Sequence, residues 1–223
     1  MTDQSELLSP DGDGFAPGDP VRLLTSSLAP MMPRLHPSAG QWLVPAVAPL
    51  RAGGLDGSGI TAVVVDTGVL PDHPSLRGRV DAMIDLTGTG REDRHGHGTV
   101  VAAILAAQAP GVRIISVKAV RDDGTADVSL LAAGIVRAGL ELPDGGTVNV
   151  SAGRRTPGCS GTCPLCSAVI SLKAGVVVAA AAGNLPGITY CPARSTISVG
   201  AAVSWDADAD FDCPPPEWTL RPG

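Results

Sequence analysis

The fold is decided by residues 60–76, Ile-Thr-Ala-Val-Val-Val-Asp-Thr-Gly-Val-Leu-Pro-Asp-His-Pro-Ser-Leu. An apolar run rich in β-branched side chains stops there at Asp66-Thr67-Gly68. A strand buried inside a parallel sheet has this composition, and its carboxyl end opens on the crevice where α/β proteins bind ligands. The pattern therefore predicts that such a strand delivers the carboxylate of Asp66 into a functional crevice. Taken alone, Asp66 could equally cap the turn after the strand.

A second motif, Arg94-His95-Gly96-His97-Gly98-Thr99, precedes an apolar run that predicts a helix over residues 97–108. Further strands are predicted at residues 80–86, as an edge strand, and at 113–120, and a second helix at 127–140 has Asp127 as its N-cap. Alternating strands and helices indicate an α/β fold with a mainly parallel central sheet and helices on both sides.

In this order, the two motifs resemble those of the subtilisin-like serine peptidases, which carry their acid in Asp-Thr-Gly and their base in Gly-His-Gly-Thr. The resemblance covers residues 42–223 and leaves residues 1–41, rich in proline, as a loose N-terminal extension. It implies a three-layer subtilisin-like fold. It also implies that Asp66 orients the imidazole of His97, that His97 is the general base, and that Asn184 donates its amide to the oxyanion.

The same resemblance implies a peptide or protein substrate, which would lie extended beside Ser151-Ala152-Gly153 as an added strand. The walls of the main specificity pocket would then come from Ala181-Ala182-Gly183 and the turn at Tyr190. Two positions in the predicted helix depart from the family. Val100 stands where a histidine is usual, and Ala103 stands where a glycine is usual.

The family's nucleophile, a serine in Gly-Thr-Ser-Met-Ala, has no counterpart in these residues. We therefore expect a truncated catalytic domain that lacks the C-terminal nucleophile helix. Such a chain is either inactive alone and active only with a complementing protein chain, or it is a pseudoenzyme that binds peptides or proteins as a scaffold. Both alternatives stay open at this point. A homodimer that covers the side left open by the missing helix is a further expected partner.

A cysteine cluster lies outside the family pattern. Cys159, Cys163 and Cys166 fall within eight residues of one loop, and Cys191 follows the next predicted strand. Both segments leave the sheet at the same edge, so the four thiols could surround a tetrahedral Zn²⁺. Disulfides and free thiols are the alternatives, and Cys213 is expected to stand outside the cluster.

Charge and hydropathy exclude two classes of partner. The formal net charge is −6 and no cluster of Lys and Arg occurs, which argues against nucleic acid. The apolar run over residues 174–185 is too short to span a bilayer. The first residues carry no secretory signal, so we expect a cytoplasmic protein, or a secreted one if this N-terminus is not the native one.

Overall fold

The computed structural model describes residues 20–23, 50, 52–156, 158–183 and 190–200. Its central sheet has six strands, and every neighbouring pair in it is parallel. In spatial order these strands are β10 (Ile197–Val199), β8 (Val176–Ala181), β6 (Gly146–Val150), β2 (Thr61–Asp66), β4 (Arg113–Lys118) and β3 (Val80–Asp85). The prediction of a mainly parallel sheet is confirmed, as is the edge position of β3.

Strand β2 is the point where the order of the sheet reverses. From β2 the chain first forms one side of the sheet, with β3 at the edge and then β4 next to β2, and it then continues on the other side with β6, β8 and β10. In open α/β sheets the crevice for a ligand forms at such a switch point, outside the carboxyl ends of the strands. Asp66 is the last residue of β2 and therefore lies at the edge of the sheet where such a crevice is expected.

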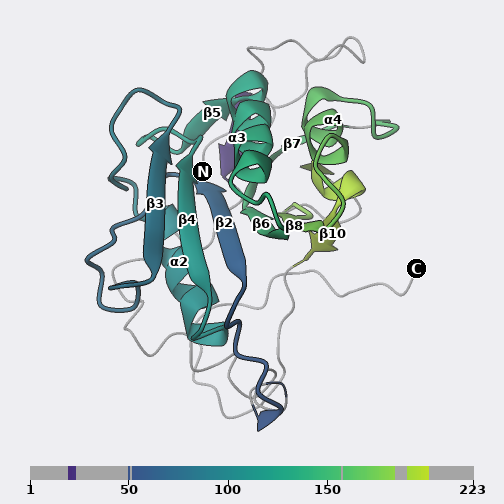
Figure 1. The fold of residues 1–223 in the computed structure, drawn as a ribbon. Helices are drawn as coiled ribbons and strands as arrows, with labels where there is room; N and C mark the ends of the chain where they lie inside the picture. The colour runs from purple at the N-terminus through teal and green to yellow at the C-terminus, as the bar shows by residue number, and fades with distance from the viewer. Residues whose placement is uncertain (1–19, 24–49, 51, 157, 184–189, 201–223) are drawn as a thin grey trace, which may run out of the picture.

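Helices cover both faces of the sheet and give the fold its three layers (Figure 1). On one face α2 (His97–Gln108) packs Ala102 and Ala106 against Ala62 and Val64 of β2. On the other face α3 (Val128–Leu140) and α4 (Pro164–Ile170) share a larger buried core with the strands. The helices predicted at 97–108 and 127–140 are confirmed.

Coverage of the sheet is uneven on the face that carries α2. Val178 of β8 faces α3 and α4 and is buried, whereas its neighbour Val177 points to the opposite face and is 45% exposed. Because successive side chains of a strand point to opposite faces, this difference in exposure shows that one face of β8 is covered and the other is not. Among the described residues, α2 covers the sheet over β2, and β8 lies open beside it.

A second, antiparallel sheet lies beside the first. Its order is β5 (Thr125–Asp127), β1 (Pro20–Leu23), β7 (Ala152–Arg155) and β9 (Tyr190–Cys191), and a short 3-10 helix, η4 (Ala193–Ser195), follows. The chain passes from the central sheet into this one between Val150 and Ala152. Of the segment predicted to lie beside the substrate, Ser151 thus stands between the two sheets, and Ala152 and Gly153 begin β7.

Most of the predicted N-terminal extension lies outside the described residues, and its boundary at residue 41 stays a prediction. The part that is described is ordered as β1, between β5 and β7. Proline is accepted at the first residue of a strand because no ladder hydrogen bond is lost there, and Pro20 has that place. No helix in the described part of the chain is long and apolar enough to cross a membrane.

Candidate active site

The two motif residues Asp66 and His97 meet at the carboxyl end of β2. His97 Nδ1 lies 2.7 Å from Asp66 Oδ1, and both side chains are buried, with Asp66 0% and His97 4% exposed. An ionised carboxylate can only accept, so Nδ1 carries the proton and Nε2 is left as the basic nitrogen of the neutral ring. This is the arrangement that a general base needs.

The Asp-Thr-Gly turn and the start of α2 are packed directly together. Gly98 N donates to Thr67 Oγ1 at 3.0 Å, and Thr67 N donates to Asp66 Oδ1 at 2.7 Å. A Cβ atom at Gly98 would collide with the carbonyl oxygen of Gly68. Glycine at position 98 therefore lets the helix approach the strand closely enough for His97 to reach Asp66.

Asp93 is a site residue that the sequence interpretation missed. Its Oδ1 accepts from Thr67 Oγ1 at 2.8 Å and from the backbone nitrogens of His95 and Gly96 at 3.1 and 2.7 Å. Its Oδ2 accepts from Thr99 N at 2.8 Å and Thr99 Oγ1 at 2.6 Å. Because the N-cap residue Gly96 has no side chain, Asp93 satisfies the backbone donors that the start of α2 would leave unpaired.

Lys118 is a second residue near the site that the motifs do not contain. It ends β4, opposite Asp66 in the register, and is 0% exposed. Its Nζ donates to the carbonyl oxygen of Glu92 at 2.7 Å and to Asp122 Oδ1 at 2.5 Å. The buried ammonium is therefore paired, and it fixes the loop that leads to Asp93.

The electrostatic surroundings favour the charged imidazolium. Burial lowers the pKa of His97, but the hydrogen bond with Asp66 and the negative charges of Asp66 and Asp93 outweigh it and raise the pKa above the ordinary value of 6.5. A base held in this way can take a proton from a nucleophile and stabilise the resulting charge against the Asp66 carboxylate. The geometry is thus suited to acid–base catalysis.

The chain's own strand β1 lies between β5 and β7 and pairs with both. We call the place that β1 fills between these two strands the groove. Arg22 is opposite Thr125 on one side and Gly153 on the other, and both pairings are antiparallel. Ala152 and Gly153 therefore lie in β7, as the wall of a groove that accepts an extended backbone. A Cβ atom at Gly153 would come within 2.6 Å of the Cys191 carbonyl oxygen, so this wall is closely backed by β9.

The predicted pocket residues lie at the same edge of the sheet as Asp66. Ala181 ends β8, and β8 follows β6 and β2 in the parallel sheet. Ala182 comes next and is held by two backbone bonds, since its N–H donates to Val199 and its carbonyl oxygen accepts from Tyr190. Gly183 is also described, whereas Asn184 lies outside the described residues, so its role stays a prediction.

The hydroxyl groups of Ser151 and Ser160 are engaged with other side chains. Ser151 Oγ accepts from Asn149 Nδ2 at 2.9 Å, and the Ser160 hydroxyl lies 3.1 Å from that of Thr162 in an exposed loop. Within the described part of the chain, no serine hydroxyl is hydrogen-bonded to His97. The arrangement supplies an acid and a base, and the described residues place no nucleophile beside them.

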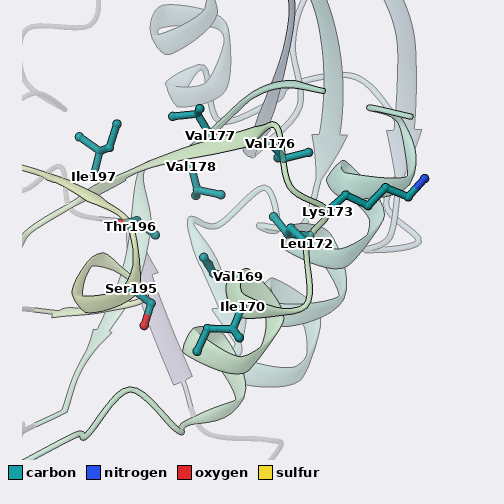
Figure 2. A pocket seen from close by; sticks show the side chains of 10 residues that line it. All are labelled: Val169, Ile170, Leu172, Lys173, Val176, Val177, Val178, Ser195, Thr196 and Ile197. Atoms are coloured by element: carbon teal, nitrogen blue, oxygen red, sulfur yellow. The ribbon is translucent and has the colours of Figure 1, made fainter. Parts of the chain in front are cut away.

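A separate hollow of about 400 Å³ lies between α4, β8 and the start of β10. Its lining is largely aliphatic, and Figure 2 shows the amino group of Lys173 pointing away from it. None of the predicted site residues lines it. The hollow is therefore distinct from the site at Asp66 and His97, and its lining directs no group for acid–base chemistry into it.

The four clustered cysteines are brought together as predicted, beside the groove wall. Burial raises the pKa of the Cys163 thiol to about 11 and also raises that of Cys191. At Cys159 burial acts in the same direction, but hydrogen bonds from the Gly161 backbone and from neighbouring thiols lower the pKa to about 7. All four are free cysteines.

Comparison with known proteins decides the family. The family model described as "Subtilase family" matches residues 57–218, which is well over half of the chain. The chain belongs to the subtilase family. This subtilase chain is 36% identical to Subtilisin-like protease 2 of Pseudogymnoascus destructans and 33% identical to an Extracellular serine proteinase of a Thermus species, with 70% of the chain covered in each case.

The solved structures agree with the sequence relatives. A cold adapted subtilisin-like serine proteinase matches this subtilase chain with a TM-score of 0.57 and 30% sequence identity, over 66% of this chain and 55% of that one. The subtilisin-like fold expected from the two motifs is confirmed. The aligned regions cover 40% and 39% of the two curated relatives, so the chain spans about two fifths of their length.

Proposed function

We propose that this subtilase chain carries the acid, the base and the peptide-binding groove of a serine endopeptidase site. In this proposal Asp66 holds the His97 ring, and His97 Nε2 takes the proton of a serine hydroxyl that comes from outside the described residues. A complementing protein chain or further sequence of the same polypeptide would bring that serine. Alone, the described residues bind a peptide without cleaving it.

The observation that carries the proposal is the buried pair of Asp66 and His97, whose Nδ1 and Oδ1 atoms lie 2.7 Å apart. A charged carboxylate is costly to bury unless it is paired. Here Oδ1 accepts from both Thr67 and His97, whereas Oδ2 has no partner among the described residues. A purely structural turn would not need such a group beside an imidazole, so chemistry at this position explains its presence.

The groove supports an extended peptide as the substrate. Strand β1 lies antiparallel between β5 and β7, which means that both walls offer backbone groups to a third strand. Such pairing recognises the backbone of a peptide, and side-chain pockets then add selectivity. We infer that a protein or peptide substrate takes the place of β1 and that Ala181, Ala182 and Gly183 line the pocket beside the scissile bond.

The experiment combines a hydrolysis assay with active-site labelling. The full 223-residue chain is incubated with an internally quenched peptide library and, separately, with a fluorophosphonate probe. We expect neither hydrolysis at rates typical of the family nor labelling. A site that lacks one member of the triad hydrolyses peptides more slowly than an intact triad by orders of magnitude. Labelling of Ser151 or Ser160 that disappears in His97→Ala would contradict the proposal of an outside nucleophile.

A second arm tests completion of the site. An extract of the source cells is added to the chain, and serine labelling and hydrolysis are measured with the wild type and with the His97→Ala variant. A complementing chain predicts a signal that appears only with the wild type. If neither serine labelling nor hydrolysis depends on His97 and the chain still binds peptides, the alternative function is supported.

That alternative is a pseudoprotease that acts as a peptide- or protein-binding scaffold. Val100 and Ala103 in α2 depart from the family pattern and favour this alternative. They indicate that catalysis constrains the sequence of the helix beside His97 less strictly than in the family. A scaffold predicts that Asp66→Asn and His97→Ala leave peptide affinity unchanged and that no partner restores hydrolysis. The two functions share the groove and differ only in whether His97 moves a proton.

A further inference from the structure

The four clustered cysteines converge from two separate stretches of the chain. Cys159 lies in the loop after β7, Cys163 is the N-cap of α4, Cys166 lies in its first turn, and Cys191 ends β9. Their Sγ atoms all lie within 4.8 Å of one another. Residues 159–166 and Cys191, which lies 25 residues after Cys166, thus deliver four soft ligands to one point.

The spacing of the sulfur atoms fits one metal ion. With Zn–S bonds of about 2.3 Å, a tetrahedron of four sulfurs has edges of about 3.8 Å. Sulfur atoms within 4.8 Å of one another reach that size with small side-chain movements. A cluster of several iron atoms keeps its cysteine sulfurs further apart, because the cluster itself lies between them.

The immediate surroundings are those of metal-bound thiolates. Cys166 and Cys191 are 0% exposed and Cys163 is 5% exposed, while Cys159 closes the site toward solvent. Backbone N–H groups point at two of the sulfurs, from Gly161 to Cys159 Sγ at 3.4 Å and from Cys166 to Cys163 Sγ at 3.5 Å. Such donors stabilise the negative charge that thiolates bring to a metal site.

Disulfide bonds explain the arrangement less well. Two disulfides need two pairs of cysteines, and each pair can form without the other being near it. Here every sulfur is close to the other three. The spacing Cys-x3-Cys-x2-Cys followed by a distant fourth cysteine also falls within the ligand spacings of structural zinc sites.

We propose that Cys159, Cys163, Cys166 and Cys191 bind one structural Zn²⁺ ion. Each thiol gives up its proton to solvent and forms one Zn–S bond, so four protons leave and the site carries a net charge of −2. Four protein ligands fill the tetrahedron, which leaves no open position for water or substrate. The ion is therefore structural and does not take part in acid–base chemistry at His97.

The metal would stabilise β7, the wall of the groove, from the side opposite β1. It joins α4 to β9, and β9 pairs with β7 through Arg154 and Cys191. Strand β7 in turn forms one side of the groove that β1 occupies. The zinc site would thus crosslink a region of short strands, in which β7 and β9 are joined by two residue pairs. This inference does not depend on whether the groove belongs to an enzyme or to a scaffold.

The test uses the untagged full chain, purified with a thiol reductant and without chelator. Zinc is counted by plasma mass spectrometry, and its ligands are determined by X-ray absorption at the zinc edge. We expect about one zinc per chain, surrounded by four sulfurs at about 2.3 Å. Less than about a tenth of an equivalent, bound iron, or a first shell with nitrogen or oxygen would overturn the proposal.

Variants locate the site. Cys163→Ser and Cys191→Ser are each expected to lose at least about nine tenths of the bound zinc, and the matched control Cys213→Ser, which also removes one thiol, is expected to retain it. If a cluster variant fails to fold, the absorption measurement on the wild-type chain still decides the ligands. Intact-mass detection of two disulfides within the cluster of the native chain, purified without reductant, would equally overturn the proposal.

Discussion

At the scale of single residues, a carboxylate that belongs to neither motif joins the two halves of the candidate active site. Asp93 accepts hydrogen bonds from Thr67 on one side and from the start of α2 on the other. It touches neither the Asp66 nor the His97 side chain through any of these bonds. Asp93 is therefore a positioning residue, whose loss would loosen the approach of the helix to the strand.

We expect Asp93→Ala to lower the free energy of unfolding by roughly 3–5 kcal/mol, because several buried donors lose a charged acceptor at once. Urea denaturation measures the change. Its neighbour Glu92→Ala is the matched control, since that side chain is exposed, and it should stay within about 0.5 kcal/mol. Equal small effects in the two variants would show that Asp93 does not hold the site together.

The raised pKa of His97 gives a second expectation at this scale. Asp66→Asn should lower the pKa of His97, because burial remains while the charged acceptor is lost. A proton NMR titration of the ring measures it, and His73, whose Nδ1 accepts from Ser75 N in a separate loop, helps to assign the spectrum. An unchanged His97 pKa in the variant would mean that Asp66 does not set the charge of the ring.

The same shift predicts how stability depends on pH. A group whose pKa is higher in the folded state contributes stability that is fully present below the unfolded-state pKa, near 6.5. That contribution is lost as the pH rises through the higher folded-state pKa. The difference in unfolding free energy between wild type and Asp66→Asn should therefore shrink on going from pH 5 to pH 9.

Sequence alone predicted the residues that stand in strong local patterns. Asp66 ends a β-branched run and His97 opens an apolar helix, so both could be placed from their neighbours. Asp93 could not, because Arg91-Glu92-Asp93-Arg94 looks like a charged surface loop, and only the fold turns one of its carboxylates inward. The signal that could have found it is an acidic residue just ahead of a helix whose N-cap is glycine.

At the scale of elements, β1 is one of the short strands that the sequence did not predict. It is four residues long and stands among prolines, with no alternation to mark it. Its existence depends on partners about 100 or more residues away in the chain, at Thr125 and Gly153. Local propensity carries no information about such pairing, whereas the long parallel strands follow from their own composition.

We expect Arg22→Pro to free the groove, because proline in a strand with neighbours on both sides removes a ladder hydrogen bond. A labelled peptide with the sequence of residues 18–26 should then bind to the variant more tightly than to the wild type. The expected gain in affinity is roughly tenfold for each 1.4 kcal/mol of binding free energy that β1 contributes as a competitor in the wild type. Fluorescence polarisation measures the affinity. Pro20→Ala, which alters the first residue of the same strand, is the control and should leave the affinity near that of the wild type.

Two results would contradict this interpretation. Equal affinity in Arg22→Pro and wild type would mean that β1 does not compete for the groove. Equal binding of a scrambled peptide would mean that the groove is not the site of binding.

At the scale of the whole molecule, the two faces of the central sheet are covered to different extents. Ile197 and Val199 of β10 and Val177 of β8 are 58%, 52% and 45% exposed. Exposed apolar residues gathered on neighbouring strands mark a surface that associates. The nucleophile helix expected for the family and a second copy of the chain are both partners of the kind that such a surface would accept.

We expect the purified chain to associate with itself in a concentration-dependent way, which sedimentation velocity measures. Val177→Lys should shift the distribution toward monomer, because it places a charge on the open face of β8. Leu140→Lys is the control, since Leu140 is 70% exposed on α3, away from that face. A monomer at all concentrations for the wild type would exclude the homodimer and leave a complementing chain as the candidate partner.

The position of β2 has a consequence for the order in which parts of the protein open. This strand is hydrogen-bonded to β4 on one side and to β6 on the other, and Val63, Val64 and Val65 are fully buried. Amide hydrogens in such a strand exchange with solvent only when the whole domain unfolds, whereas short strands such as β1 and β9 exchange through local fraying. In hydrogen–deuterium exchange the groove should therefore label within early time points and the strand that carries Asp66 last. The molecule can open and close its groove many times while the Asp66 carboxylate stays in place.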